Sequence, residues 1–153
     1  MFELERIRPE HFDEIKGQES QIYFSNLLLK HPEYKEMICK QSIGRAGRLD
    51  GDIIAICGIT CVTEYLGEGW AYFSKDLPKG SIKVIKAIKK FINSQKQFRR
   101  IQCTVDVHNT QAIRFAEVLG FKFESILKSY GPDGHDHAMF TIIRRNLDWE
   151  VQD

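Results

Sequence analysis

The sequence predicts an α/β fold, with a mixed and twisted β-sheet of six to seven strands and helices on both faces. Segments of helical period and segments of strand period alternate along the 153 residues. An Asp-Gly pair joins two strand patterns, which is typical of an antiparallel hairpin. Strand–helix–strand segments follow, and these require parallel pairing through a right-handed crossover. The length and a hydrophobic content of 42% fit one domain over residues 1–153.

The first quarter of the chain is expected to hold one short strand and three helices. Alternating apolar and polar residues predict a strand at residues 2–6. A brief helix follows at residues 11–16. The second helix starts at Ile22 and ends at His31–Pro32, because the residue before a proline avoids the helical conformation. Residues 33–40 fit a third short helix.

A β-hairpin follows. Its strands are expected at residues 43–49 and 53–62, and Asp50–Gly51 supplies the positive φ angles of a tight turn. The second strand is almost continuously apolar, so we expect it to be covered on both faces. Gly67–Gly69 is expected to form a second turn, which leads into a returning strand at residues 70–73.

The clearest helix of the sequence spans residues 81–94. Ser81 is suited to cap its N-terminus, and lysines flank its polar side. One apolar stripe runs along the helix and is expected to face the core. The stripe consists of Ile82, Ile85, Ala87, Ile88, Phe91 and Ile92.

The last third of the chain returns to alternating strands and helices. A strand is expected at residues 101–107, and a helix at residues 109–119 that stops at Gly120. Asn109 is placed to cap this helix. Two final strands, at residues 121–127 and 138–144, complete the expected sheet.

Charge and composition argue against several classes of partner. Lys plus Arg number 22 and Asp plus Glu 21, so the basic excess that nucleic-acid binding requires is absent. The sequence has no apolar run of 18 residues, and its first residues are too charged for a signal peptide, so we expect a cytoplasmic protein without a membrane partner. Cys57 and Cys61 lie roughly 13 Å apart on one strand, which is too far for a disulfide. We expect all four cysteines to be reduced and mostly buried.

One long segment resembles a known family. Residues 105–121 read V-D-V-H-N-T-Q-A-I-R-F-A-E-V-L-G-F. This is similar to the GNAT pattern V-x-x-x-N-x-x-A-I-x-hydrophobic-x-x-x-x-G-F. With the order of elements, the resemblance to the GNAT superfamily of acyl-CoA N-acyltransferases covers nearly the whole chain. The last two strands and the loop at residues 131–134 look most like the branch that acetylates protein N-termini. A looser similarity links the chain to GNAT-like proteins of bacteriophages.

The resemblance implies acetyl-CoA as the co-substrate. A helix N-terminus offers free N–H groups and a positive dipole end to a pyrophosphate, and the helix that begins near Ser81 is placed for this role. In the family, the strand before that helix lines the pantetheine arm, and its backbone N–H stabilises the oxyanion. The phosphate loop here departs from the family pattern because it keeps only one glycine. The expected cofactor-binding residues are Tyr72, Phe73, Ser74, Lys79, Gly80, Ser81, Ile82, Asn109 and Phe115.

The catalytic residues are less well defined by the sequence. Glu64 follows the long apolar strand and is the candidate general base, acting through water, although the sequence favours an exposed acid beside a turn over this role. Glu68 is a second candidate for the general base, with the same alternative explanation. Ala116 occupies the place where many GNAT members carry a tyrosine that protonates the leaving thiolate. Tyr130 is therefore the expected general acid, with Ser74 as the alternative.

Two functions follow from the resemblance. The first is transfer of an acetyl group from acetyl-CoA to a primary amine, on a small molecule or a protein N-terminus; the resemblance also allows a homodimer. The second is a catalytically inactive GNAT-like protein that serves in interaction or phage virion assembly. An open, V-shaped cleft between the strands at 70–73 and 101–107 would favour the enzyme. His135–His137 is a weak indication of a metal site, and we expect none there without further ligands.

Overall fold

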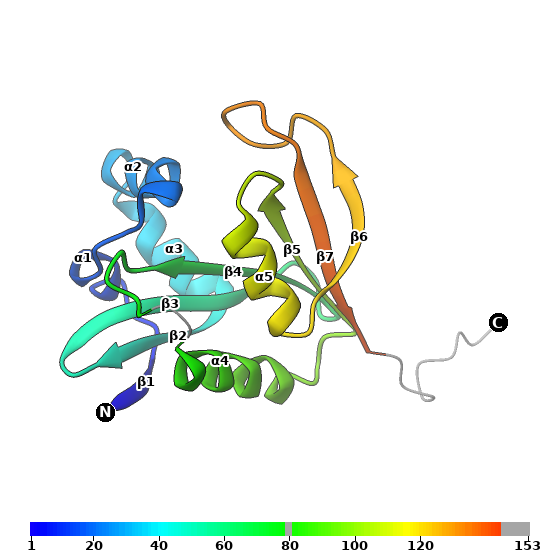
Figure 1. Cartoon of the computed structure of the whole chain (residues 1–153). Coiled ribbons are helices and arrows are strands. Elements are labelled where there is room, and N and C mark those ends of the chain that lie inside the picture. Colours follow the sequence, from blue (N-terminus) through cyan, green and yellow to red (C-terminus); the bar gives the residue numbers. More distant parts are fainter. Residues whose placement is uncertain (79–80, 145–153) are drawn as a thin grey trace.

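A seven-stranded mixed sheet with the order β1-β2-β3-β4-β5-β7-β6 forms the centre of the molecule (Figure 1). The computed structural model describes residues 1–78 and 81–144, apart from the side chain of Glu19. No helix within these residues is both long and apolar enough to cross a membrane. In chain order the elements are β1 (Phe2–Arg6), α1 (His11–Glu14), the 3₁₀ helix η1 (Glu19–Gln21), α2 (Ile22–Lys30), α3 (Glu33–Gln41), β2 (Ser42–Leu49), β3 (Asp52–Cys61), β4 (Leu66–Phe73), α4 (Ile82–Ser94), β5 (Arg100–Asp106), α5 (Thr110–Val118), β6 (Lys122–Leu127) and β7 (His137–Ile143).

The predicted hairpin is confirmed as β2 and β3. These strands pair antiparallel, and Asp50 and Gly51 between them have φ angles of 49° and 98°. Such angles are easily reached by Asp-Gly and match the twist of the flanking strands. Seven consecutive residues of β3, from Ile53 to Ile59, are buried. The expectation that this strand is covered on both faces is therefore correct.

The turn expected at Gly67–Gly69 is wrong. The chain reverses earlier, because Thr63 Oγ1 accepts hydrogen bonds from the backbone N–H groups of Tyr65 and Leu66. The glycines lie inside β4 instead. A Cβ atom on Gly67 would come within 2.3 Å of Ile59 Cγ2, so this glycine serves close packing between strands rather than a turn.

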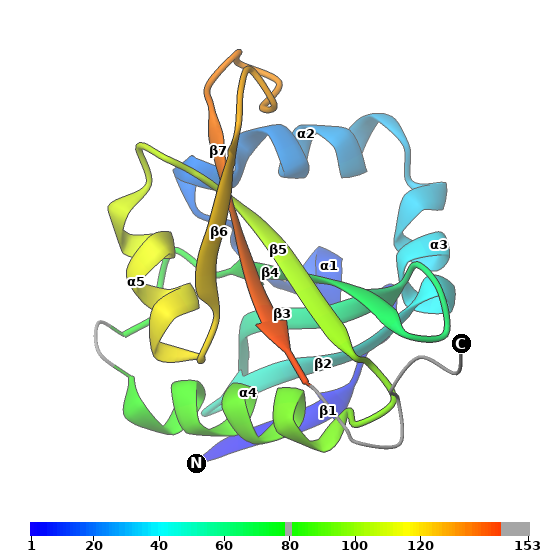
Figure 2. The ribbon, with the colours of Figure 1, turned by 90° about the vertical axis from the view of Figure 1, so that its right-hand side faces the viewer.

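Each face of the sheet carries its own hydrophobic core. The helices α1, α2 and α3 pack over one face, and α4 and α5 cover the other (Figures 1 and 2). The stripe predicted on α4 is correct in its centre, since Ile88 and Phe91 are buried. The prediction is wrong at the start of the helix, where the side chain of Ile82 is 64% exposed and Val84, which the stripe does not include, is only 2% exposed. The helix is therefore turned about its own axis relative to the prediction, so that the side chain of Val84 faces the sheet.

The crossovers differ in how their strands pair. β4 and β5 flank α4 and pair in parallel, as the sequence predicts for a strand–helix–strand unit. The parallel pairing expected for the later strand–helix–strand unit is wrong: β5 and β6 flank α5 without pairing, because β7 lies between them and is antiparallel to both. The final hairpin thus folds back into the sheet beside β5, and this brings the β6–β7 loop to the carboxyl end of β5.

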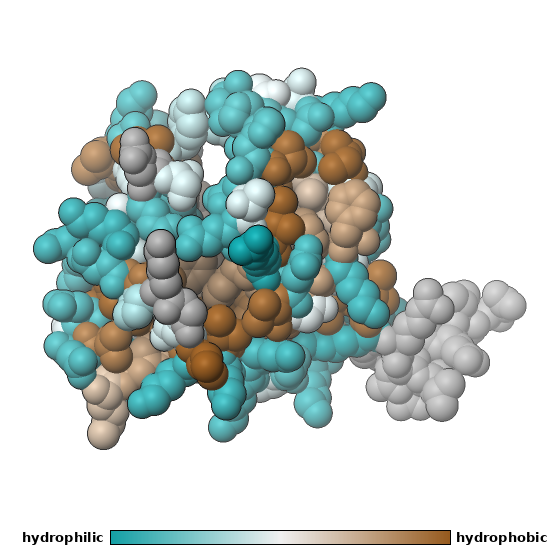
Figure 3. All heavy atoms as spheres, viewed as in Figure 1, coloured by the Kyte–Doolittle hydropathy of each residue, from teal (hydrophilic) through white to brown (hydrophobic). Residues whose placement is uncertain are grey.

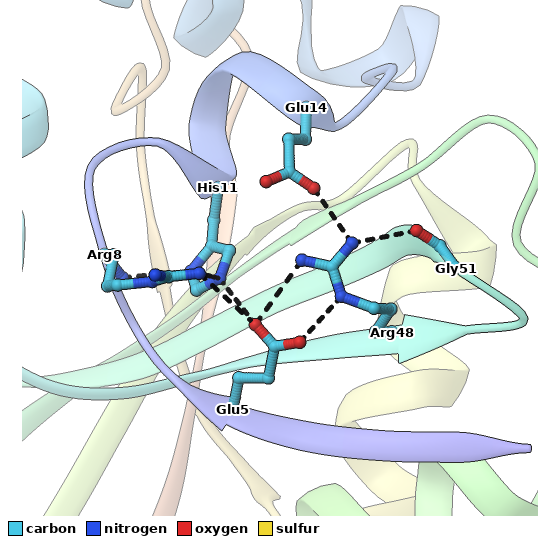
Figure 4. Close-up of polar contacts among 6 residues, drawn as sticks. All are labelled: Glu5, Arg8, His11, Glu14, Arg48 and Gly51. Atoms are coloured by element: carbon cyan, nitrogen blue, oxygen red, sulfur yellow. Dashed lines mark hydrogen bonds and ion pairs between the residues drawn. The ribbon is translucent and has the colours of Figure 1, made fainter.

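A network of polar side chains fastens β1 and α1 to β2 (Figure 4). Arg48 Nε donates to Glu5 Oε1 at 2.6 Å, and Arg48 Nη1 donates to Glu14 Oε2 at 3.0 Å. His11 is fully buried. Its Nδ1 accepts from the Arg8 backbone N–H at 3.0 Å, so its Nε2 carries the proton toward Glu5 Oε2 at 2.9 Å. Buried polar groups need partners of this kind, so we assign the network a structural role.

Candidate acetyl-transfer site

The site begins where two parallel strands separate. β4 and β5 pair over only three positions, from Leu66–Arg100 to Glu68–Gln102. Beyond this point β4 continues to Phe73 and β5 to Asp106, and Figures 1 and 2 show them diverging. A cavity of about 740 Å³ extends from the gap, lined by residues of both strands and of the helices beside them. Figure 3 shows the molecule hollowed between the side carrying α2 and the side carrying β5 and β7.

The cavity has two differently lined ends. One end is bordered by the amino-terminal parts of α4 and α5, and its lining is mostly apolar; it includes Ser81, Val84, Ile85, Asn109, Ala112 and Phe115. The other end is bordered by η1, α2 and the β6–β7 loop, and its lining is more polar; it includes Gln18, Gln21, Tyr23, Pro132, Asp133 and His137. A cleft that opens through a sheet can receive one reactant from each side, with the reacting atoms meeting at the gap.

Backbone groups of β4 that β5 would otherwise pair with point into the gap. Gln21 fills part of this edge with its side-chain amide: Nε2 donates to Ala71 O at 2.8 Å, and Oε1 accepts from Phe73 N–H at 2.8 Å. The backbone N–H of Gln18 donates to Phe73 O at 3.2 Å. The edge of β4 therefore offers a donor and acceptors in the spacing of a strand, and a primary amide already pairs with it.

The amino-terminal ends of α4 and α5 both border the cavity, but they differ in their capping hydrogen bonds. Asn109 Oδ1 accepts from the backbone N–H of Ala112 at 3.0 Å, which confirms the predicted cap of α5. Ser81 occupies the cap position of α4, but its side chain makes no capping hydrogen bond. The free N–H groups at this helix end are thus available to an anion. Lys79 and Gly80, which the sequence predicts to bind the pyrophosphate, lie outside the described residues.

Glu68 stands at the last paired position of β4, where the gap opens. Its Oε2 accepts from Gln102 Nε2 at 2.9 Å. Burial raises the pKa of the Glu68 carboxyl above its ordinary value of 4.5, while the hydrogen bond from Gln102 and the charge of Arg100 act in the opposite direction. The next residues of the strand, Gly69 and Trp70, line the cavity. A carboxylate with a raised pKa beside a cleft is suited to accept a proton.

The residues that the sequence assigns to the acyl donor divide into two groups. Phe73, Ser81, Asn109 and Phe115 border the cavity, and the rings of Phe73 and Phe115 meet edge to face with centroids 4.8 Å apart. Tyr72, Ser74 and Ile82 are not among its described lining residues, and they are placed differently.

Each residue of the second group has another environment. Tyr72 is buried on the opposite face of β4, where its hydroxyl and Ser25 Oγ share a hydrogen bond of 2.6 Å. Ser74 is also buried, and its Oγ accepts from the Asp76 N–H at 3.0 Å. Ile82 faces solvent.

The two predicted catalytic residues lie apart from the gap. Glu64 is exposed in the turn between β3 and β4, before the paired part of β4. Tyr130 is 56% exposed in the β6–β7 loop, and its ring lies 5.3 Å from that of His137. Neither residue is part of the described cavity lining, and Glu68 itself is not part of it either. Glu68 differs from Glu64 in being half-buried and in lying at the last paired position of β4, next to the lining residues Gly69 and Trp70.

The cysteines near the site are unsuited to nucleophilic catalysis. Burial raises the pKa of both the Cys57 and the Cys103 thiols to about 12, and the charge of Glu68 adds to the effect at Cys103. Both line the cavity and stay protonated near neutral pH, whereas the reactive species is the thiolate. All four cysteines are free, as predicted, but the expectation that they are mostly buried is wrong: Cys57 is buried, Cys39 and Cys103 are half-buried, and Cys61 is exposed.

Comparison with known proteins identifies this arrangement. A family model described as an acetyltransferase (GNAT) domain matches residues 3–138. The chain belongs to the GNAT acetyltransferase family. No curated protein sequence matches closely enough to count as a relative.

Solved structures with the same fold are distant in sequence. A putative acetyltransferase from Acinetobacter baylyi has a TM-score of 0.76 and 14% identity, covering 100% of this chain and 98% of that one. The putative acetyltransferase yncA from Salmonella typhimurium, solved with its cofactor acetyl-CoA, has a TM-score of 0.71 and 11% identity over 95% of both chains. A dodecameric spermidine N-acetyltransferase from Vibrio cholerae has a TM-score of 0.67 and 14% identity over 94% of both. Identities this low establish the GNAT fold alone.

The segment from Gln18 to Tyr23, which leads into α2, contributes to the site of this GNAT domain, although no sequence pattern predicts this. Gln18, Gln21 and Tyr23 border the cavity, yet they lie some 50 residues before β4 in the chain. Their polar character is ordinary for a helix and its entry, and no spacing links them to the strand. The tight bidentate contact of Gln21 with β4 exists only in the folded molecule.

Proposed function

We propose that this protein transfers an acetyl group from acetyl-CoA to a primary amine. The observation that carries the proposal is the parting of β4 and β5 at Glu68, beside a cavity that opens toward α4 and α5 at one end and toward α2 and the β6–β7 loop at the other. A thioester and an amine that enter from opposite ends would meet at the gap. Membership of the GNAT family supports the same reaction.

The acyl donor would enter along the edge of β4. The pantetheine arm of CoA contains secondary amides, which can pair with Phe73 N–H and Ala71 C=O as a neighbouring strand would. Gln21 now holds these two groups, so its side chain has to swing away when the donor binds. The pyrophosphate would lie at the amino-terminal end of α4, where free N–H groups favour an anion.

Glu68 would prepare the amine for attack. An alkyl ammonium must lose a proton before its nitrogen can attack the thioester carbon, and the Glu68 carboxylate is placed to receive that proton through a water molecule. The nitrogen then forms a new C–N bond and gives up its second proton, the C–S bond breaks, and the thiolate of CoA takes up one proton and leaves as the thiol. A preorganised backbone N–H on the open edge of β4 would stabilise the oxyanion formed in between.

Two classes of amine could accept the acetyl group, a polyamine or a protein N-terminus. One GNAT neighbour acetylates spermidine, and the more polar lining at the α2 end of the cavity, including Asp133, suits a cationic amine. A protein N-terminus is the second acceptor class, since it also presents a primary amine. A panel of polyamines and of peptides with free N-termini separates the two.

Calorimetric titration with acetyl-CoA tests the proposal. We expect saturable one-to-one binding with a dissociation constant below about 1 mM, and acetylation of at least one amine in the panel. Failure to bind the donor at about 1 mM would overturn it. Donor binding without acetylation of any amine would instead favour a GNAT-like protein that has lost catalysis, in line with Ala116 at the position of the expected tyrosine.

A further inference from the structure

A second cluster of chemically active side chains lies at the carboxyl end of β5. Asp106 ends β5, His108 lies in the turn that follows, and His135 comes from the β6–β7 loop. Their potential ligand atoms all lie within 4.8 Å of one another. The rings of His108 and His135 meet at 67° with their centroids 4.6 Å apart. From this juxtaposition we propose a binding site for a divalent transition-metal ion of the zinc type, formed by Asp106, His108, His135 and Asp133.

Two carboxylates converge on one nitrogen. His135 Nδ1 lies 2.9 Å from Asp106 Oδ2 and 3.1 Å from Asp133 Oδ2. An imidazole Nδ1 has a single proton to give, so it cannot satisfy both oxygens. A metal ion can be shared by all three atoms. The carboxylates of Asp106 and Asp133 bring two negative charges close to this nitrogen, which favours a cation at this point.

The carboxylates are already oriented by backbone donors. Asp106 Oδ1 accepts from His108 N–H at 2.8 Å, and Asp133 Oδ1 accepts from His135 N–H at 2.9 Å. In each case the second oxygen remains turned toward His135. Hydrogen bonds of this kind fix ligand orientation around metals and are characteristic of built sites.

The distances from His135 Nδ1 to Asp106 and Asp133 are close to those between neighbouring ligand atoms of a small tetrahedral ion. Ligand atoms about 2.0–2.1 Å from zinc lie roughly 3.3 Å apart. The two oxygen–nitrogen distances are a few tenths of an ångström shorter than this, as expected when a proton occupies the place of the ion. His108 must move closer, and its ring is exposed and has no side-chain hydrogen bond to any described residue. Two imidazoles and two carboxylates suit zinc or cobalt better than calcium or magnesium, which prefer oxygen ligands alone.

The ion would join two segments that are distant in the sequence. It would tie the β5–α5 turn to the β6–β7 loop at the wall of the cavity, which Asp106 and Asp133 help to line. The proposal is independent of the acetyl-transfer reaction, because it depends on the ligand geometry alone.

Titration of the tag-free, metal-free protein with Co²⁺, followed by its visible absorption, tests the site. We expect one-to-one binding with bands of a four-coordinate ion, displaced by Zn²⁺, and a rise in the melting temperature on adding Zn²⁺. His108→Ala removes an exposed ring without a hydrogen-bond partner among the described residues, so its fold should persist. This variant should bind Co²⁺ at least about tenfold more weakly.

His31→Ala is the matched control, because His31 is exposed and far from the cluster in sequence, with Glu33 as its ion-pair partner and the ring of Tyr34 stacked on it. It should bind Co²⁺ like the unaltered protein. His135→Ala should lose binding as His108→Ala does, with far-UV circular dichroism confirming its fold. The proposal is overturned if the protein shows no stoichiometric Co²⁺ band, or if His108→Ala binds the ion as tightly as the His31→Ala control.

Discussion

At the scale of single residues, the environment of each carboxylate decides what it can do. Glu68 and Glu64 lie four positions apart in one segment, but Glu68 is partly buried at the gap between β4 and β5 and Glu64 is exposed in a turn. Burial raises the pKa of Glu68. A proton acceptor near the reacting amine gains from this shift, because its basicity increases.

Glu68→Gln should therefore lower kcat/KM by roughly 100-fold while leaving the affinity for acetyl-CoA nearly unchanged. The activity of the unaltered protein should rise with pH through a pKa above 4.5, since the base must be deprotonated, and the variant should lose this acidic limb. Steady-state kinetics across pH measure both effects. Glu64→Gln is the matched control and should retain full activity; the opposite pattern would return the role to Glu64.

Glu5 illustrates the reverse shift. Its hydrogen bond to Arg48, supported by one to His11, lowers the pKa of its carboxyl from 4.5 to about 2 (Figure 4). The network therefore contributes stability that is fully present above about pH 4.5 and is lost as the pH falls toward 2. Melting temperatures should fall over this range, and Glu5→Gln should flatten the fall. Glu3→Gln, an exposed neighbour, should leave the curve as it is; an unchanged curve in both variants would show that the network does not control acid stability.

At the scale of elements, the open edge of β4 is the feature that most affects ligand binding. Gln21 pairs with this edge through two hydrogen bonds, at the place where an acyl donor would pair. The side chain thus competes with the donor in the free protein. The competition is intramolecular, because η1 holds Gln21 beside the strand.

Gln21→Ala should therefore bind acetyl-CoA more tightly, by about fivefold, since each displaced hydrogen bond has a net value of about 1 kcal/mol and water replaces part of it. Calorimetry measures the change. Gln97→Ala, on an exposed residue after α4, should leave the affinity unaltered. Weaker donor binding in Gln21→Ala would instead mean that Gln21 helps to hold the donor.

The glycines of β4 give a second prediction for this strand. An added Cβ at Gly67 would lie 2.3 Å from Ile59 Cγ2, and Ile59 is buried at 1% exposure. Gly67→Ala should lower the free energy of unfolding by about 1–3 kcal/mol through overpacking. At Gly69 the nearest atom would be 3.6 Å away, so Gly69→Ala should change stability by no more than about 0.5 kcal/mol. Urea unfolding compares them; equal stabilities would contradict the packing argument.

At the scale of the whole molecule, the two cores share the interior strand β3. Ile53 and Ile56 of β3 belong to the core under α1–α3, and Ile54 and Ile59 belong to the core under α4 and α5. Loss of either core would expose one side of β3. The cores should therefore depend on each other for stability.

The chain is accordingly expected to unfold as one domain in a single cooperative transition. Urea curves followed by far-UV circular dichroism and by tryptophan fluorescence should have the same midpoint, because Trp70 lies in the shared sheet. The Gly67→Ala variant should shift both midpoints together. Two separate midpoints would show that the faces of the sheet unfold independently.

Much of the architecture could be predicted from local patterns. The Asp50–Gly51 turn, the apolar β3 strand and the Asn109 cap each depend on residues close in sequence, and all three are confirmed. The GNAT resemblance rests on one contiguous segment from strand to helix to strand, so it too could be recognised locally. Patterns of this length determine which elements form and which faces are buried.

The site was decided by contacts between distant residues. Gln21 meets β4 across about 50 positions, and the β5 turn meets the β6–β7 loop across nearly 30. Gly67–Gly69 resembles a turn in sequence, but Gly67 lies in β4 because the buried side chain of Ile59 occupies the space that a Cβ atom would need. Likewise, local sequence patterns could not rank Glu68 above Glu64, since their burial depends on where β4 and β5 separate. Sequence alone determined the family and the sheet; only tertiary packing determined the gap, because strand separation depends on long-range burial and pairing.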